Sequence, residues 1–260
     1  MPFSHIQFEA LDGIATVTVN RPEKRNALHL ETMGELGQAF KEITVNDSIK
    51  AAIITGAGDR AFVAGADINE LARTSPQSAE HLSRFGQDIF RLLETMRKPS
   101  VAAINGVALG GGLELAMCCT VRFAAPEAML GQPEVKLGML AGYGATQRLP
   151  LLIGRGRALE MLLSAEPVTA AEAFRLGLVN RVVPAAELLS ASRAWLTKCI
   201  ANGSYAIGLT MEAVDVGFTS GFEAGLRYES AAFGLIASTQ ERVEGLRAFL
   251  EKRSPIFTGN

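Results

Sequence analysis

Three consecutive glycines, Gly110 to Gly112, lead into an apolar segment, and a carboxylate, Glu114, follows almost at once. N–H groups at the start of a helix have no intrahelical acceptor, so they can bind an anion. The segment lacks the lysine of a phosphate-binding loop and the glycine spacing of a dinucleotide fingerprint, and Glu114 would repel a phosphate. Two interpretations remain: the N–H groups stabilise an oxyanion that develops on a carbonyl, or the glycines only form a tight turn.

Three further segments favour the oxyanion interpretation. AFVAGADI, residues 61–68, is a small-residue turn after a predicted buried strand, and it could present a second backbone donor. GQPEVKLGM carries Glu134 after Pro133, and AGYGATQRL adds a second glycine loop. Two carboxylates can divide acid and base work if one is ionised and the other protonated. Taken alone, Glu134 would rather be interpreted as a helix-start carboxylate after a proline.

The composition is that of an ordinary folded protein of 260 residues, with 48% apolar and 20% charged residues. The formal net charge of −2 argues against a dedicated nucleic-acid surface. No apolar run is long enough to cross a bilayer, and the start of the chain has no basic segment leading into a hydrophobic one. We therefore expect a soluble, cytoplasmic protein without nucleic-acid or membrane partners.

Cysteine and histidine usage predicts neither disulfides nor a metal. Cys118, Cys119 and Cys199 are an odd number of cysteines in a long chain, which is typical of reduced, buried thiols. The three histidines are isolated from one another along the sequence, so none has metal-ligand spacing. They are His5, His29 and His81.

Strands and helices alternate along the first two thirds of the chain. IQFEALDGIATVTVN predicts a hairpin, KAAIITGAG and SVAAING predict buried strands, and residues 30–43 have helical periodicity. TVRFAA and AMLGQPE predict short strands, and TQRLPLLIGRGRALEMLLSA predicts a helix. From about residue 185 to 252 the apolar periodicity predicts successive helices alone. The pattern indicates an α/β fold with a C-terminal helical region.

Four segments in this order and spacing, AFVAGADI, NGVALGGGLELAMCC, GQPEVKLGM and GYGATQRL, resemble the crotonase superfamily, and specifically enoyl-CoA hydratases. The resemblance extends over essentially the whole chain, to ESAAFGLIASTQERVEGLRAFLEKR. It implies a crotonase spiral of ββα units over residues 1–195, which holds the acyl-CoA site. Residues 196–260 would form a helical oligomerisation region that builds a trimer or a dimer of trimers.

The resemblance also implies roles for four catalytic residues. The N–H groups of Ala66 and Gly111 would stabilise the thioester enolate. Glu114 would orient and deprotonate the water that attacks C3, and Glu134 would supply the proton to C2. The implied reaction is reversible syn hydration of a short-chain trans-2-enoyl-CoA. The alternative is another reaction of the superfamily, such as enoyl-CoA isomerisation, and which glutamate rests protonated stays open.

Further residues match substrate-binding positions of the family. CoA would lie along RPEKRNAL and AGADI, Gly142 would line the water site, and the C-terminal positions would approach the acyl tail or CoA, partly from a neighbouring subunit. The expected partners are the acyl-CoA substrate and further copies of the chain, with no separate cofactor. The residues implied in substrate binding are Lys24, Ala64, Asp67, Ile68, Gly142, Phe233, Phe249 and Lys252.

The sequence departs from the family pattern at three positions. Asn69 replaces a lysine that often lies beside the adenine, and Ala141 replaces a usual proline. Tyr143 is bulkier than the alanine of some relatives, so we expect it to narrow the acyl pocket and favour short chains. RNA binding, known for one branch with a lysine-rich helix, is disfavoured because ELARTSPQSAEHLSRFGQDIF has few basic residues.

Overall fold

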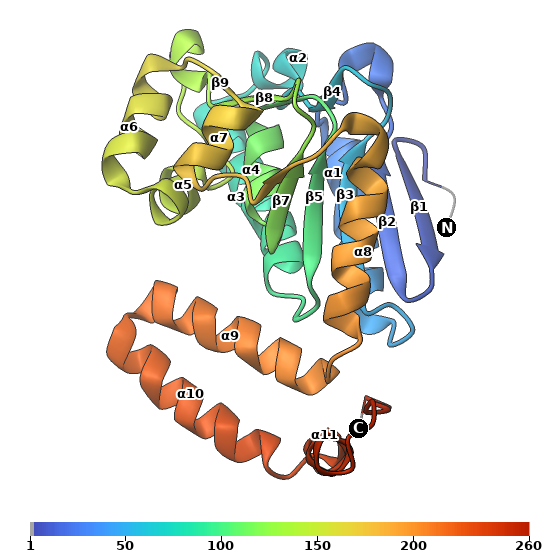
Figure 1. Ribbon diagram of the computed structural model, residues 1–260. Coiled ribbons are helices and arrows are strands. Elements are labelled where there is room, and N and C mark those ends of the chain that lie inside the picture. The colour runs from blue at the N-terminus through green and yellow to red at the C-terminus, as the bar shows by residue number, and fades with distance from the viewer. Residues whose placement is uncertain (1–2, 260) are drawn as a thin grey trace.

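The computed structural model describes residues 3–259 and contains two β-sheets enclosed by helices (Figure 1). In spatial order, the larger sheet consists of β1 (Ile6–Leu11), β2 (Ile14–Val19), β3 (Ala51–Gly56), β5 (Ser100–Ile104), β7 (Val121–Ala124) and β10 (Arg181–Val182). The smaller sheet consists of β4 (Ala61–Val63), β6 (Val107–Leu109), β8 (Met129–Gly131) and β9 (Val168–Thr169).

Helices alternate with the strands as far as β10, and after it the chain is helical. They are α1 (Leu30–Val45), α2 (Ile68–Leu71), α3 (Pro76–Glu94), α4 (Gly111–Met117), α5 (Ala145–Ile153), α6 (Arg155–Ser164), α7 (Ala170–Leu176), α8 (Leu188–Ile200), α9 (Ser204–Ser220), α10 (Phe222–Ile236) and α11 (Gln240–Leu250). Three short 3₁₀ helices are η1 (Pro22–Lys24), η2 (Glu134–Leu137) and η3 (Ala185–Glu187). Within residues 3–259, no helix has the length and apolar character that crossing a membrane requires.

The chain visits the two sheets alternately, which produces the spiral of ββα units. β3 of the larger sheet is followed by β4 of the smaller one, then by α2 and α3. β5, β6 and α4 repeat this order, and β7 and β8 begin it again. Strands of successive turns pair in parallel, β3 with β5 and β5 with β7, because each turn returns to the same edge. This confirms the α/β crotonase fold that the resemblance implied.

The predicted N-terminal hairpin is present, with Leu11 opposite Ile14. Its two turn residues, Asp12 and Gly13, have φ angles of 52° and 77°. Positive φ at both positions is the requirement of the tight turn that suits the twist of a hairpin, and an Asp-Gly pair meets it at little cost.

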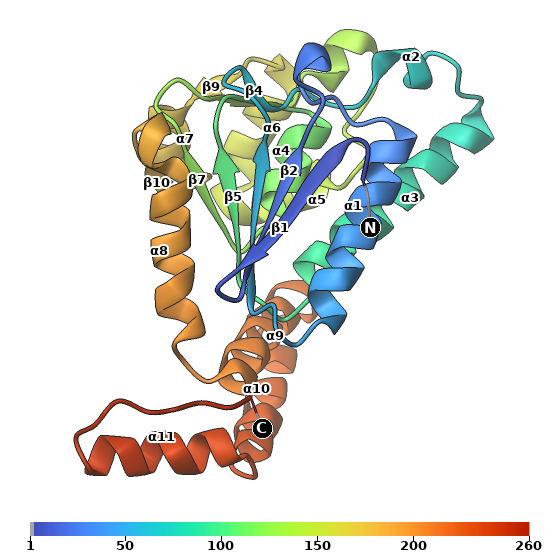
Figure 2. The same ribbon diagram turned by 90° about the vertical axis from the view of Figure 1, so that its right-hand side faces the viewer.

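The larger sheet has an apolar core on each of its faces. Successive residues of a strand point to opposite sides, so Ile54 joins one core and Ile53 the other. One face is covered by α1 and α3, which bury Phe40 and Phe90 against it. Figure 2 shows α8 on the opposite face, where Leu196 packs in the second core.

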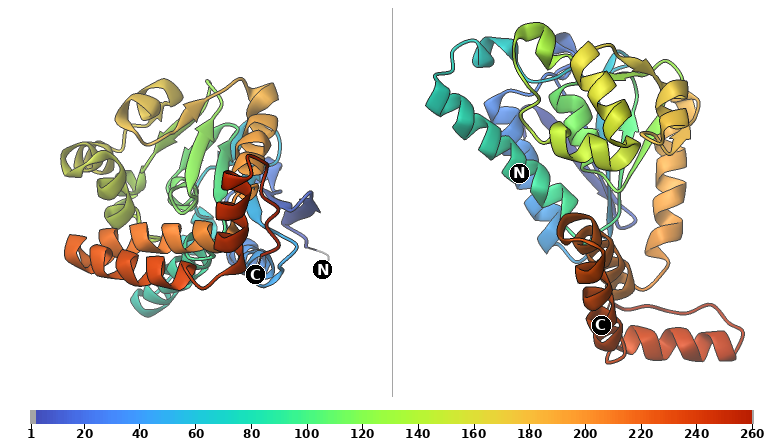
Figure 3. Two further views of the ribbon diagram at one scale, coloured as in Figure 1. Left: turned by 60° about the horizontal axis from the view of Figure 1, so that its bottom comes forward. Right: turned by 90° about the vertical axis from the view of Figure 1, so that its left-hand side faces the viewer.

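The C-terminal helices extend away from this core. Figures 1 and 3 show α9 and α10 lying side by side below the sheets, with α11 crossing their end. No residue of α10 is buried, and Phe218, Phe222 and Phe249 are exposed in the chain. α8 packs on the core and includes residue 195. The sequence analysis placed the boundary between the spiral core and the helical oligomerisation region at this residue, and that boundary stays a prediction.

Several elements differ from the sequence-based expectation. The helix expected over residues 146–165 is divided into α5 and α6, because Gly154 between them has φ 80° and ψ 153°. The strands β4, β6, β9 and β10 were not foreseen, since two or three residues are too few to display an alternating pattern, and β4 begins the segment expected to be a turn. β6 nevertheless aligns the glycine run with the smaller sheet, and Gly110 N–H donates to the carbonyl of Gly131 at 3.0 Å.

The start of α4 crosses β4 at very close range. A Cβ added to Gly112 would lie only 2.0 Å from the carbonyl oxygen of Val63, and all seven residues of α4 are buried. Only a residue without a side chain allows the helix to begin at this place.

We expect Gly112→Ala to lower the free energy of unfolding by ~3 kcal/mol or more, because backbone must move to relieve the overlap. Gly34→Ala is the matched control, since Gly34 lies in α1 and a Cβ there meets nothing within 4 Å. Its expected effect is a gain of up to ~1 kcal/mol from helix propensity. Urea unfolding at fixed protein concentration measures both, and equal stabilities of the two variants would contradict the close crossing.

Candidate active site

A cavity of roughly 180 Å³ opens where the loop after β4, the start of α4, and the segment before α5 converge. Apolar side chains of α2, α3 and the loop after η2 complete its wall, among them Leu71, Leu82 and Leu140. The residues named from the sequence that line it are Ala64, Ala66, Ile68, Gly111, Glu114, Glu134, Gly142 and Tyr143. Segments separated by up to about eighty residues therefore meet at one place.

Two backbone N–H groups lie close together at this cavity. Leu28 forms a parallel bridge with Ala66. The N–H of Leu28 donates to the carbonyl of Gly65, and the N–H of Asp67 donates to the carbonyl of Leu28. Within residues 3–259 this pairing leaves the N–H of Ala66 without a protein acceptor. Gly111 is the first residue of α4, where helix geometry offers its N–H no acceptor. A Cβ built on Gly111 would lie 3.6 Å from the nitrogen of Ala66, so the two donors are close neighbours.

Glu114 is held by the backbone of the loop before α5. Its Oε1 accepts hydrogen bonds from the N–H groups of Tyr143 at 2.8 Å and Ala145 at 2.9 Å. The residue is 1% exposed. Burial raises the pKa of Glu114 to about 7, and the nearby carboxylate of Glu134 adds to the rise, while the two N–H groups oppose it. Glu114 can therefore exchange a proton near neutral pH.

Glu134 enters the cavity from the opposite side, at the start of η2. Its Oε1 would lie 2.8 Å from a Cβ added to Gly110, whose φ of 51° and ψ of −125° also suit glycine. Burial raises the pKa of Glu134 as well. In the amide orientation that satisfies its hydrogen bonds, buried Gln132 donates to Oε1 at 2.9 Å and to Oε2 at 3.0 Å of Glu134. The side chain is therefore fixed rather than free in solvent.

The loop that holds Glu114 is itself fixed from two directions. Arg148 donates to the carbonyl of Tyr143 at 2.8 Å and forms a bidentate ion pair with Glu94 of α3, at 2.9 and 3.1 Å. Ser83 and Gln87, also on α3, donate to the carbonyl of Gly142. The sequence analysis quoted Arg148 within a motif but assigned it no role, because its partner lies 54 residues earlier.

Tyr143 is one of the side chains that line the cavity. Its ring contacts Phe90 edge to face at a centroid distance of 5.5 Å. It fills the space beside Gly86, where a Cβ would lie 2.3 Å from the ring. Burial raises the pKa of Tyr143 to about 12, so the hydroxyl stays protonated at neutral pH.

Several residues expected at the substrate do not reach this cavity within one chain. Asp67 caps α2 through Asn69 and lies 3.6 Å from Arg21, and these contacts lower its pKa although burial opposes them. Lys24 is exposed on η1. The remaining three lie on or directly after α10 and α11, at the end of the molecule opposite α2 in Figures 1 and 2. These are Phe233, Phe249 and Lys252.

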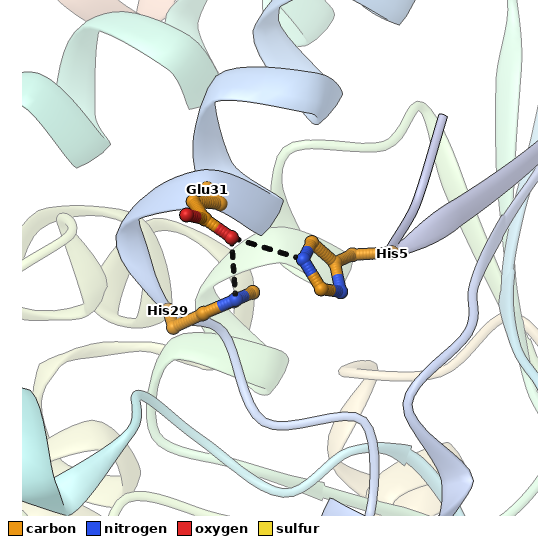
Figure 4. A group of neighbouring side chains, drawn as sticks. All are labelled: His5, His29 and Glu31. Carbon is orange, nitrogen blue, oxygen red and sulfur yellow. Dashed lines mark hydrogen bonds and ion pairs between the residues drawn. The ribbon is translucent and has the colours of Figure 1, made fainter. Parts of the chain in front are cut away.

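Two of the three histidines, His5 and His29, lie together in the fold. The rings of His5 and His29 lie 4.4 Å apart, centroid to centroid, and both approach Glu31 (Figure 4). No sequence pattern connects residues 5 and 29, because β1, β2 and η1 come between them. The group lies outside the cavity.

The geometry defines the chemistry that the cavity can perform. Two backbone donors can stabilise negative charge on a carbonyl oxygen. Two glutamates with raised pKa values can give and take protons beside it.

Comparisons with known proteins agree with this geometry. A model of the enoyl-CoA hydratase/isomerase family matches residues 9–260. The chain is 43% identical to a crotonyl-CoA hydratase of Syntrophomonas wolfei, with 99% of both chains covered, and 40% identical to a short-chain-enoyl-CoA hydratase of Clostridium acetobutylicum, with 97% of both covered. An enoyl-CoA hydratase crystal structure from Bacillus anthracis superposes with a TM-score of 0.95 at 37% identity, covering 99% of this chain and 100% of that one. The chain therefore belongs to the enoyl-CoA hydratase/isomerase family of the crotonase superfamily.

Proposed function

We propose that the chain catalyses the reversible syn addition of water to a short-chain trans-2-enoyl-CoA. The observation that carries this proposal is the pair of fixed glutamates, Glu114 and Glu134, at one cavity with two unpaired backbone donors. The hydratase relatives named above support the same reaction class.

The thioester carbonyl would accept hydrogen bonds from the N–H groups of Ala66 and Gly111. Attack at C3 moves electron density through C2 to this oxygen, so the two donors stabilise the enolate that forms. Loss of one such donor typically lowers the rate of an enzyme ~10²- to 10³-fold, so these hydrogen bonds would supply a principal part of the rate enhancement. Because both donors are backbone groups on rigid segments, they need no reorganisation during the reaction.

The two carboxylates would divide the proton transfers. Glu114 takes a proton from the water as its oxygen bonds to C3, and Glu134 gives a proton to C2 of the enolate. The product is the 3-hydroxyacyl-CoA, and exchange of protons with solvent restores the starting state. Since the groups lie close enough to influence each other, the apparent pKa values belong to the pair.

The remaining contacts with substrate complete the proposal. The adenosine and pyrophosphate of CoA would follow η1 and the loop after β4, with Lys24 available to the phosphates. Ala64, Asp67 and Ile68 would shape this path. Phe233, Phe249 and Lys252 would reach the acyl tail or CoA from a neighbouring subunit of a trimer or a dimer of trimers.

Replacing either glutamate tests the two-carboxylate mechanism directly. We expect Glu114→Gln and Glu134→Gln each to lower kcat for crotonyl-CoA by ~10²-fold or more, since each removes one proton-transfer group. Loss of the conjugated thioester absorbance measures the rate, and trans-3-enoyl-CoA tests for isomerisation in parallel. Near wild-type hydration by both variants would contradict the mechanism, and faster turnover of the 3-enoyl substrate would favour the isomerase.

The same substitution at Glu114 has an expected effect on stability. The folded pKa of about 7 exceeds the ordinary 4.5, so the fold favours the protonated carboxyl. This contribution is complete below about pH 4.5 and is lost as the pH rises through 7. Glutamine does not titrate, so Glu114→Gln should not lose this contribution. The unfolding free energy of the variant minus that of wild type should therefore rise by up to ~3 kcal/mol from pH 4.5 to pH 8.

Denaturant unfolding at the two pH values measures this change. Glu160→Gln, at an exposed position of α6, is the matched control for the substitution itself. A Glu114→Gln difference independent of pH would show that the buried carboxyl has an ordinary pKa.

Tyr143 should set the acyl-chain preference. Tyr143→Ala keeps the backbone N–H that binds Glu114 and removes the ring from the cavity wall. We expect kcat/KM for an enoyl-CoA two methylenes longer than crotonyl-CoA to rise roughly tenfold relative to crotonyl-CoA, at ~0.8 kcal/mol per buried methylene. A wild-type enzyme that already turns over long chains as well as C4 would refute this role.

A further inference from the structure

His5, His29 and Glu31 form a compact group on the N-terminal part of the molecule (Figure 4). His5 directly precedes β1, His29 caps the start of α1, and Glu31 lies in its first turn. The Oε2 atom of Glu31 lies 3.1 Å from Nε2 of His5 and 3.5 Å from Nε2 of His29. Both imidazoles therefore direct the same ring nitrogen toward one carboxylate oxygen.

These separations are those of ligands around one cation. For Zn²⁺ bonds of about 2.1 Å at tetrahedral angles, two ligand atoms lie about 3.4 Å apart. The two Nε2–Oε2 distances fall on either side of this value, and the three ligand atoms all lie within 4.8 Å of one another. Only a small closing movement of the two imidazoles is needed to surround an ion.

The backbone around His5 is fixed independently of its ring. The carboxylate of Glu35 accepts three successive N–H groups, from Ser4 and His5 at 2.8 Å and from Ile6 at 3.1 Å. This anchors the entry to β1 on α1, so the backbone that carries the His5 ring is held in place by α1.

His29 is fixed through its other ring nitrogen. Nδ1 lies 2.5 Å from Oγ1 of Thr32, which is buried, and the preceding residue, Leu28, pairs with Ala66. In the metal-free chain Nδ1 also accepts the backbone N–H of Thr32 at 3.4 Å, which is the cap of α1. With Nε2 on a metal, Nδ1 would carry the hydrogen and donate it to the threonine hydroxyl, in exchange for this long cap bond. Metal-binding histidines usually have such an outer partner, which orients the ring.

The group carries one formal negative charge, on Glu31, and lies partly open to solvent. The guanidinium of Arg21 lies 3.6 Å from the carboxylate of Asp67, which offsets part of its positive charge. The Glu31 side chain is 76% exposed, so an ion can enter directly from solvent.

We propose that His5, His29 and Glu31 form a binding site for one divalent transition-metal ion of the Zn²⁺ type, with solvent in the remaining positions. Two imidazoles and one carboxylate are a ligand set that zinc accepts. The bound ion clamps the entry to β1 onto the start of α1, adjacent to the strand-like pairing of Leu28 with Ala66. This site is separate from the cavity and does not depend on the proposed reaction.

Titration of the chelator-treated full chain with Zn²⁺ tests the site. Calorimetry should give one ion per chain, and the thermal transition should rise with the free Zn²⁺ concentration. Co²⁺ in place of Zn²⁺ should give visible d–d absorption without the near-ultraviolet charge-transfer band of a thiolate ligand. That band separates this site from Cys118, Cys119 and Cys199.

Single substitutions assign the ligands. His5→Gln and Glu31→Gln should each weaken Zn²⁺ binding by ~100-fold or more, since even the loss of an outer partner costs 10- to 100-fold. His29→Asn should do the same while keeping a good helix cap. His81→Gln, the remaining histidine, and Cys199→Ser are controls that should bind as wild type does.

The thermal transition of each metal-free variant reports whether it has folded, and His5→Gln and Glu31→Gln leave the helix cap intact. Absence of stoichiometric binding by the wild-type chain would overturn the proposal. So would binding that persists in His5→Gln, or that disappears in Cys199→Ser.

Discussion

A buried carboxyl group, Glu114, is the constraint on which the arrangement of the site depends. A side chain that is 1% exposed has almost no solvent to stabilise its charge, so the protein must supply donors. It supplies two backbone N–H groups from Tyr143 and Ala145, and these exist only if the loop before α5 keeps one conformation. The ion pair of Arg148 with Glu94 and the contacts of α3 with Gly142 maintain that loop. A long surface helix is thereby linked to the proton chemistry of the cavity.

The glycine run meets three different demands at three successive positions. Gly110 takes a backbone conformation and a proximity to Glu134 that a side chain would disturb. Gly111 presents its N–H to the cavity beside Ala66 and the Tyr143 ring, and Gly112 allows α4 to cross Val63. The carboxylate of Glu114 disfavours a phosphate, whereas a carbonyl oxygen that gains charge could accept these N–H groups. Under the proposed mechanism, the helix start would serve a charge that exists only during the reaction.

The sequence predicted the parts of the fold whose signals are local. The hairpin at Asp12 and Gly13 and the periodic face of α1 follow from neighbouring residues. The residues that line the cavity were named through the four motifs that resemble the family. The supports of the site could not be predicted in this way, because Arg148 meets a partner on another helix. The same reason hid the approach of His5 to His29, which depends on the folding of β1 back onto α1.

The C-terminal helices expose apolar surface that the rest of residues 3–259 does not cover. α10 buries none of its residues and α9 buries only Gly208 and Leu209, although Phe233 and Phe249 are 79% and 81% exposed. Apolar surface of this extent stabilises a protein only when something covers it. Further copies of the chain would cover it and, under the proposed assembly, carry Phe233 and Phe249 toward a neighbouring cavity. Stability of these helices and completion of the acyl-CoA site would then arise from the same contacts.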